Sequence, residues 1–338
     1  MQFIFASSGS HNQFIDNILK KSDLFINLAY EKKNTNKLNY TKFLNKNFQK
    51  QNMCGITAYI GDKECYPILI EGLERLEYRG YDSAGIATLN DNQINITKSV
   101  GKVEQLKTTN LSGTIGISHT RWATHGRPSK ENAHPHHNNE QSIALVHNGI
   151  IENYSQLKKK LIEKGYQFYS ETDTEVLTKL IDYHYKKSRD FKQGILNALH
   201  DVVGAYGIVI LNKNEEKLYA TRKGSPLVLG IGEKNTKNEE REFFIASDPA
   251  AFLKHTKRVL YLEDNDFVVV DKKTFQLSNI CEGHEECVDR DIKNIEWNLS
   301  TIEKNGYDHF MIKEILEQPE TLKQCLSGRI DLENFNAK

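Results

Sequence analysis

The sequence predicts a layered α+β domain with antiparallel sheets. Strand-like runs gather in two groups, before and after a group of helix-like segments, instead of alternating with helices in strict βαβ order. Many of these runs are short and are bounded by Gly, Asn, Asp or Ser, as expected of connections between neighbouring strands. Both observations disfavour a doubly wound parallel sheet.

The first 53 residues differ in composition from the rest of the chain. Residues 1–52 contain eight Lys, three acidic residues, one Gly and no Pro. They lack the Arg of a mitochondrial transit peptide and the long apolar core of a secretory signal. We interpret 1–53 as an N-terminal extension, either an over-extended start or a removable leader.

Alternating strand and helix signals begin after Met53. The run 55–61 predicts a strand, and Pro67 suits the first position of a helix that continues through Leu69, Leu73 and Leu76. Further strands are expected at 84–89, 93–100, 113–120 and 142–149. The first half of the domain therefore contributes one helix and several neighbouring strands.

Three helices are expected in the middle of the chain. Tyr154, Leu157 and Leu161 mark the first, residues 176–184 the second and residues 191–200 the third. A capping-box pattern at 172–175 begins the second helix and places Asp173 at its mouth. More strands are expected at 205–211, 217–222, 226–231, 243–247, 258–262 and 266–270. The tail from Asn279 is predicted as polar loop until a short helix at 309–319.

Composition excludes several classes of function. Lys+Arg and Asp+Glu balance at 45 each, so no net charge favours nucleic acid or an anionic membrane. The longest apolar run, Ala205–Leu211, is far shorter than the ~18 residues of a membrane span. Five irregularly spaced cysteines do not resemble a secreted disulfide framework, which favours the cytoplasm. A small polar ligand is the better expectation.

Familiar cofactor motifs are absent from the sequence. It has no G-x-x-x-x-G-K-[ST] phosphate loop, no G-x-G-x-x-G fingerprint and no G-x-S-x-G nucleophile elbow. His134, His136 and His137 could hold zinc if they converged, but their Asn- and Pro-containing surroundings favour a polar loop. A polar loop is also the favoured interpretation of Cys281–Cys287. We predict no metal and no cofactor.

Cys54 stands where a thiol could use its own main-chain amine. A free α-amino group has a pKa of about 7.7–8.0, so an N-terminal cysteine carries a weak base beside its nucleophile. A small buried hydrophobic residue is the alternative for an isolated cysteine. Other segments of the chain decide between the two.

Five blocks together resemble the glutaminase half of the isomerising glutamine–fructose-6-phosphate aminotransferases. They are CGITAYIG, LEYRGYDSAG, HTRWATHG, HNGIIENY and SETDTEV, in the family's order, and HFMIKEILEQP resembles the lead into its sugar-isomerase half. The resemblance runs from about Met53 to the end. It implies the amino-terminal-nucleophile hydrolase fold, a four-layer αββα sandwich of two antiparallel sheets.

The resemblance also implies roles for matching residues. Cys54 would attack the side-chain amide of L-glutamine, form a γ-glutamyl thioester and release ammonia, and the Asn148 side chain and Gly149 N–H would stabilise the oxyanion. Arg121 would hold the glutamine α-carboxylate and Asp173 its α-ammonium. The resemblance also implies a loop that folds over bound glutamine, formed by Trp122, Thr124 and His125. It implies a supporting role in the active site for Arg79.

Each of these residues also has a plainer interpretation. Arg121 could belong to a surface ion pair, Asp173 could be a helix N-cap, and Asn148-Gly149 could form a tight turn. Amidophosphoribosyltransferase and asparagine synthetase share the Cys-Gly start, but RGYDSAG and HFMIKEILEQP favour the hexosamine branch. Within the ordered set of blocks we favour function at every site residue.

The expected domains are the extension 1–53, the glutaminase domain 54–288, and 289–338 as a linker with the beginning of a missing isomerase half.

Two features limit the predicted activity. Cys54 has no free amine while 1–53 remain attached, and without its isomerase half the chain would hydrolyse glutamine but not aminate fructose 6-phosphate. A catalytically silent remnant or a glutamine-binding regulatory module is the alternative. The sequence leaves the oligomeric state open, a homo-oligomer included.

Overall fold

The computed structural model describes residues 54–123, 126–236, 239–281 and 284–296, with short stretches at 307, 311–313, 315–318, 330–331 and 336–337. Internal contacts divide the chain into two units, Asn52–Glu303 and Met1–Gln51 with Lys304–Lys338. In the second unit, 311–313 and 315–318 are helical, as expected, and two short strands pair: β16 (Ile330–Asp331) and β17 (Asn336–Ala337). The predicted boundaries at 53 and 288 stay predictions.

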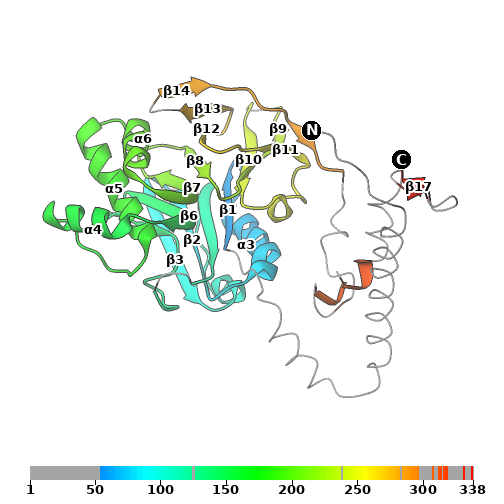
Figure 1. Ribbon diagram of the computed structural model, residues 1–338, viewed down its shortest axis with the longest axis horizontal. Coiled ribbons are helices and arrows are strands. Elements are labelled where there is room, and N and C mark those ends of the chain that lie inside the picture. The colour runs from blue at the N-terminus through cyan, green and yellow to red at the C-terminus, as the bar shows by residue number, and fades with distance from the viewer. Residues whose placement is uncertain are drawn as a thin grey trace, which may run out of the picture. The chain divides into compact units, whose positions relative to one another are not determined.

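The first unit contains two sheets, and the larger has eight strands in the described residues (Figure 1). Its order is β15-β11-β9-β10-β1-β4-β2-β3, and every neighbouring pair is antiparallel. The strands are β1 (Gly55–Ile60), β2 (Ser83–Asn90), β3 (Gln93–Val100), β4 (Ile115–Arg121), β9 (Val228–Lys234), β10 (Arg241–Ala246), β11 (Arg258–Tyr261) and β15 (Lys293–Asn294).

The second sheet has seven strands in the described residues and is also antiparallel throughout. Its order is β14-β13-β12-β8-β7-β6-β5. The strands are β5 (His136–His137), β6 (Ile143–Ile151), β7 (Gly204–Asn212), β8 (Leu218–Lys223), β12 (Asp266–Val270), β13 (Phe275–Cys281) and β14 (His284–Cys287).

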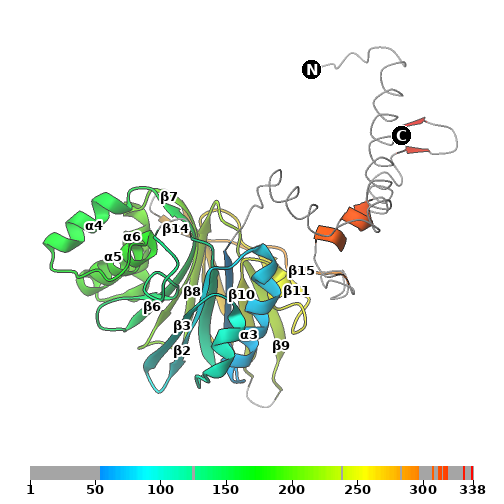
Figure 2. The ribbon, with the colours of Figure 1, turned by 90° about the horizontal axis from the view of Figure 1, so that it is seen from below.

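Helices cover the outer face of each sheet (Figure 2). The helix α3 (Cys65–Leu76) shares a core with the eight-stranded sheet. Three helices pack on the seven-stranded sheet: α4 (Tyr154–Glu163), α5 (Asp173–Ser188) and α6 (Phe191–Asp201). Short 3₁₀ turns complete the unit: η2 (Glu77–Arg79), η3 (Val103–Thr108) and η4 (Pro249–Ala251). The predicted four-layer αββα arrangement is confirmed.

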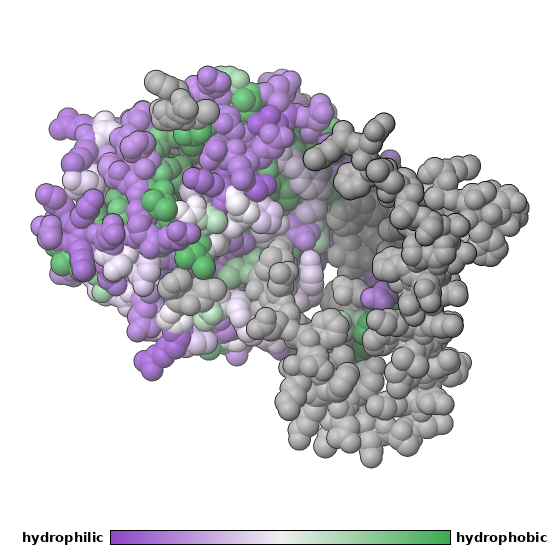
Figure 3. Space-filling view, in the orientation of Figure 1, coloured by the Kyte–Doolittle hydropathy of each residue, from purple (hydrophilic) through white to green (hydrophobic). Residues whose placement is uncertain are grey.

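The space between the two sheets is filled by alternate residues of each strand. Ile56, Ala58 and Ile60 of β1 lie there with Ile117 of β4 and Val146 of β6. All five are essentially inaccessible to solvent. A fully buried Ile or Val side chain contributes about 1.5–3 kcal/mol, so this row fixes which face of each strand turns inward. By contrast, the outer surface over α4, α5 and α6 is mostly hydrophilic (Figure 3).

Local departures from the predicted elements have identifiable causes. The helix α3 begins at Cys65, so Pro67 is its third residue; this is tolerated because first-turn N–H groups have no partner within the helix. The predicted polar loop around His136 contains the short strand β5. The tail predicted as loop from Asn279 instead forms strands β14 and β15. These strands are polar because they lie at sheet edges, where backbone pairing holds them.

The segment 284–294, called the strap below, joins the two sheets. Its first part, β14, is the last strand of the seven-stranded sheet, and its final part, β15, is the last strand of the eight-stranded sheet. Between them Arg290 donates from Nε to Asp266 Oδ2 (3.2 Å) and from Nη2 to Asp266 Oδ1 (3.0 Å). Asp266 is fully buried, so this bidentate ion pair anchors the middle of the strap.

Candidate active site

Cys54 directly precedes β1 and continues its inward-facing row, two residues before Ile56. The Trp122 N–H donates to Cys54 Sγ (3.2 Å), and the thiol faces the Trp122 carbonyl (3.6 Å). Burial raises the pKa of the thiol, and the Trp122 hydrogen bond and the Arg121 charge offset this only in part. The sulfur is therefore a protonated thiol at neutral pH and needs a base to become a nucleophile.

Asn148 lies beside Cys54, across the space between the sheets. Its Nδ2 donates to the Cys54 carbonyl (3.1 Å), and its Oδ1 lies 2.9 Å from His119 Nε2. Asn148 and Gly149 are paired within the continuous strand β6, so the tight-turn interpretation is wrong. The structure therefore places a side-chain amide donor next to the candidate nucleophile.

Gly149 occupies a position that other residues could not easily adopt. Its φ is +126°, and a Cβ atom there would lie 2.1 Å from the Ala205 carbonyl oxygen of β7. Backbone of this kind is essentially restricted to glycine. Gly149 therefore allows β6 and β7 to pair closely. Its exposed backbone follows directly after Asn148, whose side chain carries the amide.

Arg121 ends β4 with its side chain buried, only 4% exposed. Its Nη1 lies 3.8 Å from Asp82 Oδ1, and its Nη2 donates to the Gly126 carbonyl (3.1 Å). A surface ion pair is therefore the wrong description of Arg121. A buried guanidinium held in this way is suited to binding a carboxylate.

Asp173 is the first residue of α5, and Thr172 is its N-cap, accepting from the Glu175 N–H. The N-cap interpretation of Asp173 is therefore wrong. The buried carboxylate instead accepts from the Ile151 N–H (2.8 Å) and lies 4.0 Å from His147 Nδ1. It ties the start of α5 to the end of β6, close to Asn148 and Gly149.

A buried ion pair shapes the segment that leads to Asp173. Lys179, fully buried in α5, lies 2.5 Å from Glu175 Oε1 and also donates to the Gln167 carbonyl. The Glu175 carboxylate accepts from the Tyr169 N–H (3.0 Å) and the Ser170 N–H (2.7 Å). In a simple capping box this carboxylate would return to the N-cap amide. Here it fixes the preceding loop.

Three of the predicted site residues lie partly or wholly outside what the structure describes. Thr124 and His125 fall outside the described residues, and only the backbone of Arg79, at the end of η2, is described. The neighbouring Trp122 is 39% exposed, which leaves its indole available for contact with a ligand. The roles predicted for these residues stay predictions.

Two residues of the site were not predicted. Asp82 contacts Arg121, accepts from the Ala123 N–H and, at Oδ1, from Ser83 Oγ (2.8 Å). His119 contacts Asn148. Both occur inside blocks that carried the resemblance, and His119 shares a strand face with Arg121 two residues later. That spacing was the available signal.

Two of the three histidines considered as zinc ligands, His134 and His136, form a buried stack with His119, whereas His137 is half-buried beside it in sequence. His119 and His134 stack with ring centroids 4.1 Å apart, and His136 meets His134 edge-on at 4.9 Å. Burial lowers the pKa of all three. Among the described residues, no three His, Cys, Asp or Glu side chains gather so as to hold a metal ion.

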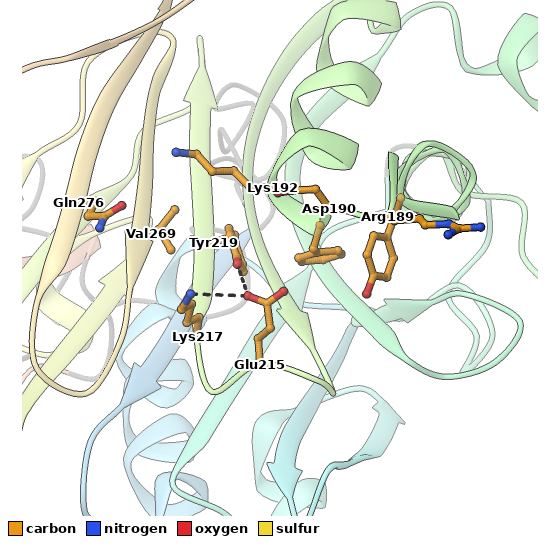
Figure 4. Close-up of a pocket in the computed structure, with 10 residues that line it drawn as sticks. Arg189, Asp190, Lys192, Glu215, Lys217, Tyr219, Val269 and Gln276 are labelled. Carbon is orange, nitrogen blue, oxygen red and sulfur yellow. Dashed lines mark hydrogen bonds and ion pairs between the residues drawn. The ribbon is translucent and has the colours of Figure 1, made fainter. Parts of the chain in front are cut away.

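A separate polar pocket of about 350 Å³ lies between the α5–α6 junction and strands β8, β12 and β13 (Figure 4). Glu215 is central to it, accepting from the Tyr219 hydroxyl and lying 3.8 Å from Lys217 Nζ. None of the predicted site residues lines it. The Glu215 carboxylate is already bound by Tyr219 and lies near Lys217. The pocket therefore offers less to a ligand than the site around Cys54.

Comparison with known proteins agrees with this geometry. Residues 119–254, which include His119, Arg121, Asn148 and Asp173, match the family described as glutamine amidotransferase domain. This chain carries a glutamine amidotransferase domain. Within the described residues, every helix of the amidotransferase is too short or too polar to cross a membrane.

Curated relatives are about half identical to this chain over the residues that they match. A protein of Bacteroides thetaiotaomicron named glutamine–fructose-6-phosphate aminotransferase [isomerizing] is 50% identical over 295 residues, covering 84% of this chain and 46% of the relative. A protein of Clostridium tetani with the same name is 49% identical over 285 residues, covering 83% and 45%. The chain thus spans less than half the length of these relatives. The resemblance to their glutaminase half is confirmed.

A solved structure supports the fold of the amidotransferase. The B. subtilis glutamine phosphoribosylpyrophosphate amidotransferase, complexed with ADP and GMP, aligns with a TM-score of 0.57 and 26% identity. The alignment covers 68% of this chain and 50% of that chain. The prediction of an amino-terminal-nucleophile hydrolase fold is confirmed by this neighbour and by the two antiparallel sheets with their covering helices.

Proposed function

We propose that this domain hydrolyses L-glutamine to glutamate and ammonia through a thioester on Cys54. The observation that carries the proposal is the 3.1 Å hydrogen bond from Asn148 Nδ2 to the Cys54 main-chain carbonyl, which sets an amide donor beside the residue that carries the thiol. Donors held in place before reaction stabilise the negative oxygen of a tetrahedral intermediate. The Gly149 N–H is the second proposed donor.

The proposed reaction has two halves. The Cys54 thiol gives its proton to its own α-amine while sulfur attacks the glutamine side-chain carbon. The C–N bond then breaks as the amine returns the proton to the leaving nitrogen, so ammonia departs and a γ-glutamyl thioester remains. Water attacks the thioester with the same amine as base, which releases glutamate and restores the thiol. The raised pKa of the thiol explains why a base is needed.

We propose that charged residues orient the substrate. The buried Arg121 guanidinium would bind the α-carboxylate in two-point geometry, and the Asp173 carboxylate would bind the α-ammonium. Trp122, Thr124 and His125 would cover the bound amino acid, and Arg79 would support the site. Asp82 would also support the site, because it contacts Arg121 and accepts a hydrogen bond from the main chain that follows.

The covalent state of Cys54 decides whether the chemistry operates. An amine bonded to Met53 is an amide nitrogen and cannot take the thiol proton. We propose that activity appears when Cys54 is the first residue, and that the ammonia serves glucosamine 6-phosphate formation from fructose 6-phosphate where an isomerase half is supplied. We propose that the reaction takes place in the cytoplasm, because the five cysteines are irregularly spaced and three of them, Cys54, Cys65 and Cys287, are free. The proposal includes no role for nucleic acid or a membrane.

The test compares a chain that begins at Cys54 with the same chain lacking the thiol. A chain begun at Met53, with that Met removed, is expected to release glutamate from glutamine, whereas Cys54→Ala in the same chain is expected to lose the activity. Equal rates in both chains would overturn the proposal. Glutamine binding without turnover in the unsubstituted chain would instead identify a regulatory binding module.

A further inference from the structure

The site forms where the inward-facing rows of two strands change from apolar to polar. In β4, Ile115 and Ile117 lie in the core between the sheets, and His119 follows in the same alternating row. In β6, Val146 lies in that core and Asn148 follows. His119 is fully buried and Asn148 is 9% exposed. The two polar side chains therefore meet across the sandwich at the end of its apolar core.

The contacts of Asn148 fix which end of its amide faces the nucleophile. The Cys54 carbonyl can only accept a hydrogen bond, so the atom 3.1 Å away must be the Asn148 NH₂ group. The opposite end is then Oδ1, which can only accept. His119 Nε2, 2.9 Å from Oδ1, must accordingly carry a proton. The Cys54 carbonyl alone therefore fixes which end of the Asn148 amide carries the nitrogen.

The environment of His119 favours a neutral ring that carries a single proton. Burial lowers the pKa of His119 to about 3, although the Asn148 hydrogen bond opposes the shift. His134 stacks against the ring with centroids 4.1 Å apart and restricts its rotation. The imidazole is thus neutral at working pH, and its single N–H is committed to Asn148. A ring in this state is not poised to take the proton of Cys54.

We propose that His119 is a positioning residue that holds Asn148 with its NH₂ group toward the developing oxyanion. If the amide turned by 180°, its carbonyl oxygen would face the negative charge and oppose the reaction. His119 acts through Asn148 and does not touch the substrate. The proposal rests on the proposed glutaminase function and adds a residue to the machinery of that site.

A double-mutant cycle tests this dependence in the catalytically competent chain. We expect His119→Phe to lower kcat about 10- to 100-fold and to leave KM within about twofold, because an oxyanion donor acts in the transition state. Against an Asn148→Ala background, the same substitution should change kcat by less than about twofold. A full additional loss in that background, or a loss expressed mainly in KM, would overturn the proposal.

Two further variants separate positioning from packing. His134→Phe keeps a ring stacked on His119 and contacts no atom of Asn148, so its kcat should stay within about threefold of the parent. His119→Gln returns an N–H donor to the same place and should recover most of the kcat lost in His119→Phe. Equal losses in His134→Phe and His119→Phe would assign the effect to packing of the stack. Circular dichroism of each variant establishes that it is folded.

A spectroscopic measurement keeps the inference testable if no glutaminase activity is found. In ¹⁵N-histidine-labelled full chain, the ring signal lost in His119→Gln should show a protonated Nε2 and no titration between about pH 5 and 8. A protonated Nδ1, or a titration in that range, would overturn the proposal whatever the activity. A chain that begins at Cys54, gives the expected ring signal and yet is inactive would instead overturn the proposed function.

Discussion

Gly149→Ala measures how closely the strands must approach at the proposed oxyanion site. A residue with a Cβ at φ +126° has a strained backbone, which costs about 1–3 kcal/mol. The new Cβ would also lie 2.1 Å from the Ala205 carbonyl oxygen, so β6 and β7 must separate, at a cost typical of overpacking, about 1–3 kcal/mol. We expect the free energy of unfolding to fall by about 2–6 kcal/mol.

Gly165→Ala is the matched control. Gly165 also has a positive φ, +88°, but a Cβ there would meet no atom within 4 Å. It should lose only the backbone term, about 1–2 kcal/mol. Urea unfolding of both variants gives the comparison, and glutaminase kinetics should show a loss of kcat of about 100-fold for Gly149→Ala alone. Equal destabilisation of the two variants would refute the steric explanation.

The remaining predictions concern the ion pair and the thiol. Lys179→Met should lower the free energy of unfolding by about 3–5 kcal/mol, because it leaves the buried Glu175 carboxylate without its cation. Adding Glu175→Gln to Lys179→Met should restore at least about 1 kcal/mol. Urea titrations that show simple additivity of the two single variants would contradict this explanation. In the full chain of 338 residues, iodoacetamide should alkylate Cys54 more slowly than a free cysteine at pH 8, with a rate still rising above about pH 9, because a raised pKa lowers the thiolate fraction. Peptide mass spectrometry follows the site, and a rate that levels off below pH 8 would show that burial does not raise the pKa.

The layered fold could be predicted because its determinants are local. Alternation along β1, β4 and β6 and helical spacing in α4 and α5 are written in short stretches of sequence. The polar edge strands β14 and β15 were missed because long-range backbone pairing, rather than side-chain alternation, decides their conformation. The short strand β5 was missed for the same reason, because two residues are too few to show an alternating pattern.

The sequence pointed to the candidate site residues but not to their support. Short motifs suggested Cys54, Asn148 and Arg121, because the proposed chemistry requires a nucleophile, an amide donor and a cation. Motifs do not reveal which neighbours hold those groups. The contacts of Asp82 and His119 cross between strands distant in sequence, so they emerge only from the folded chain. The same reason explains why Asp173 was taken for a possible cap.

The strap forms one edge of each sheet with a single piece of chain, while β3 and β5 lie at the opposite edges. A free edge strand offers unpaired N–H and C=O groups to other molecules and so invites aggregation. Here β14 ends one sheet and β15 ends the other, with Arg290 fastened to Asp266 between them. Release of that one ion pair would loosen both ends together. We therefore expect the conformations of these two edges to be coupled, although the sheets have no hydrogen-bonded strand pair in common among the described residues.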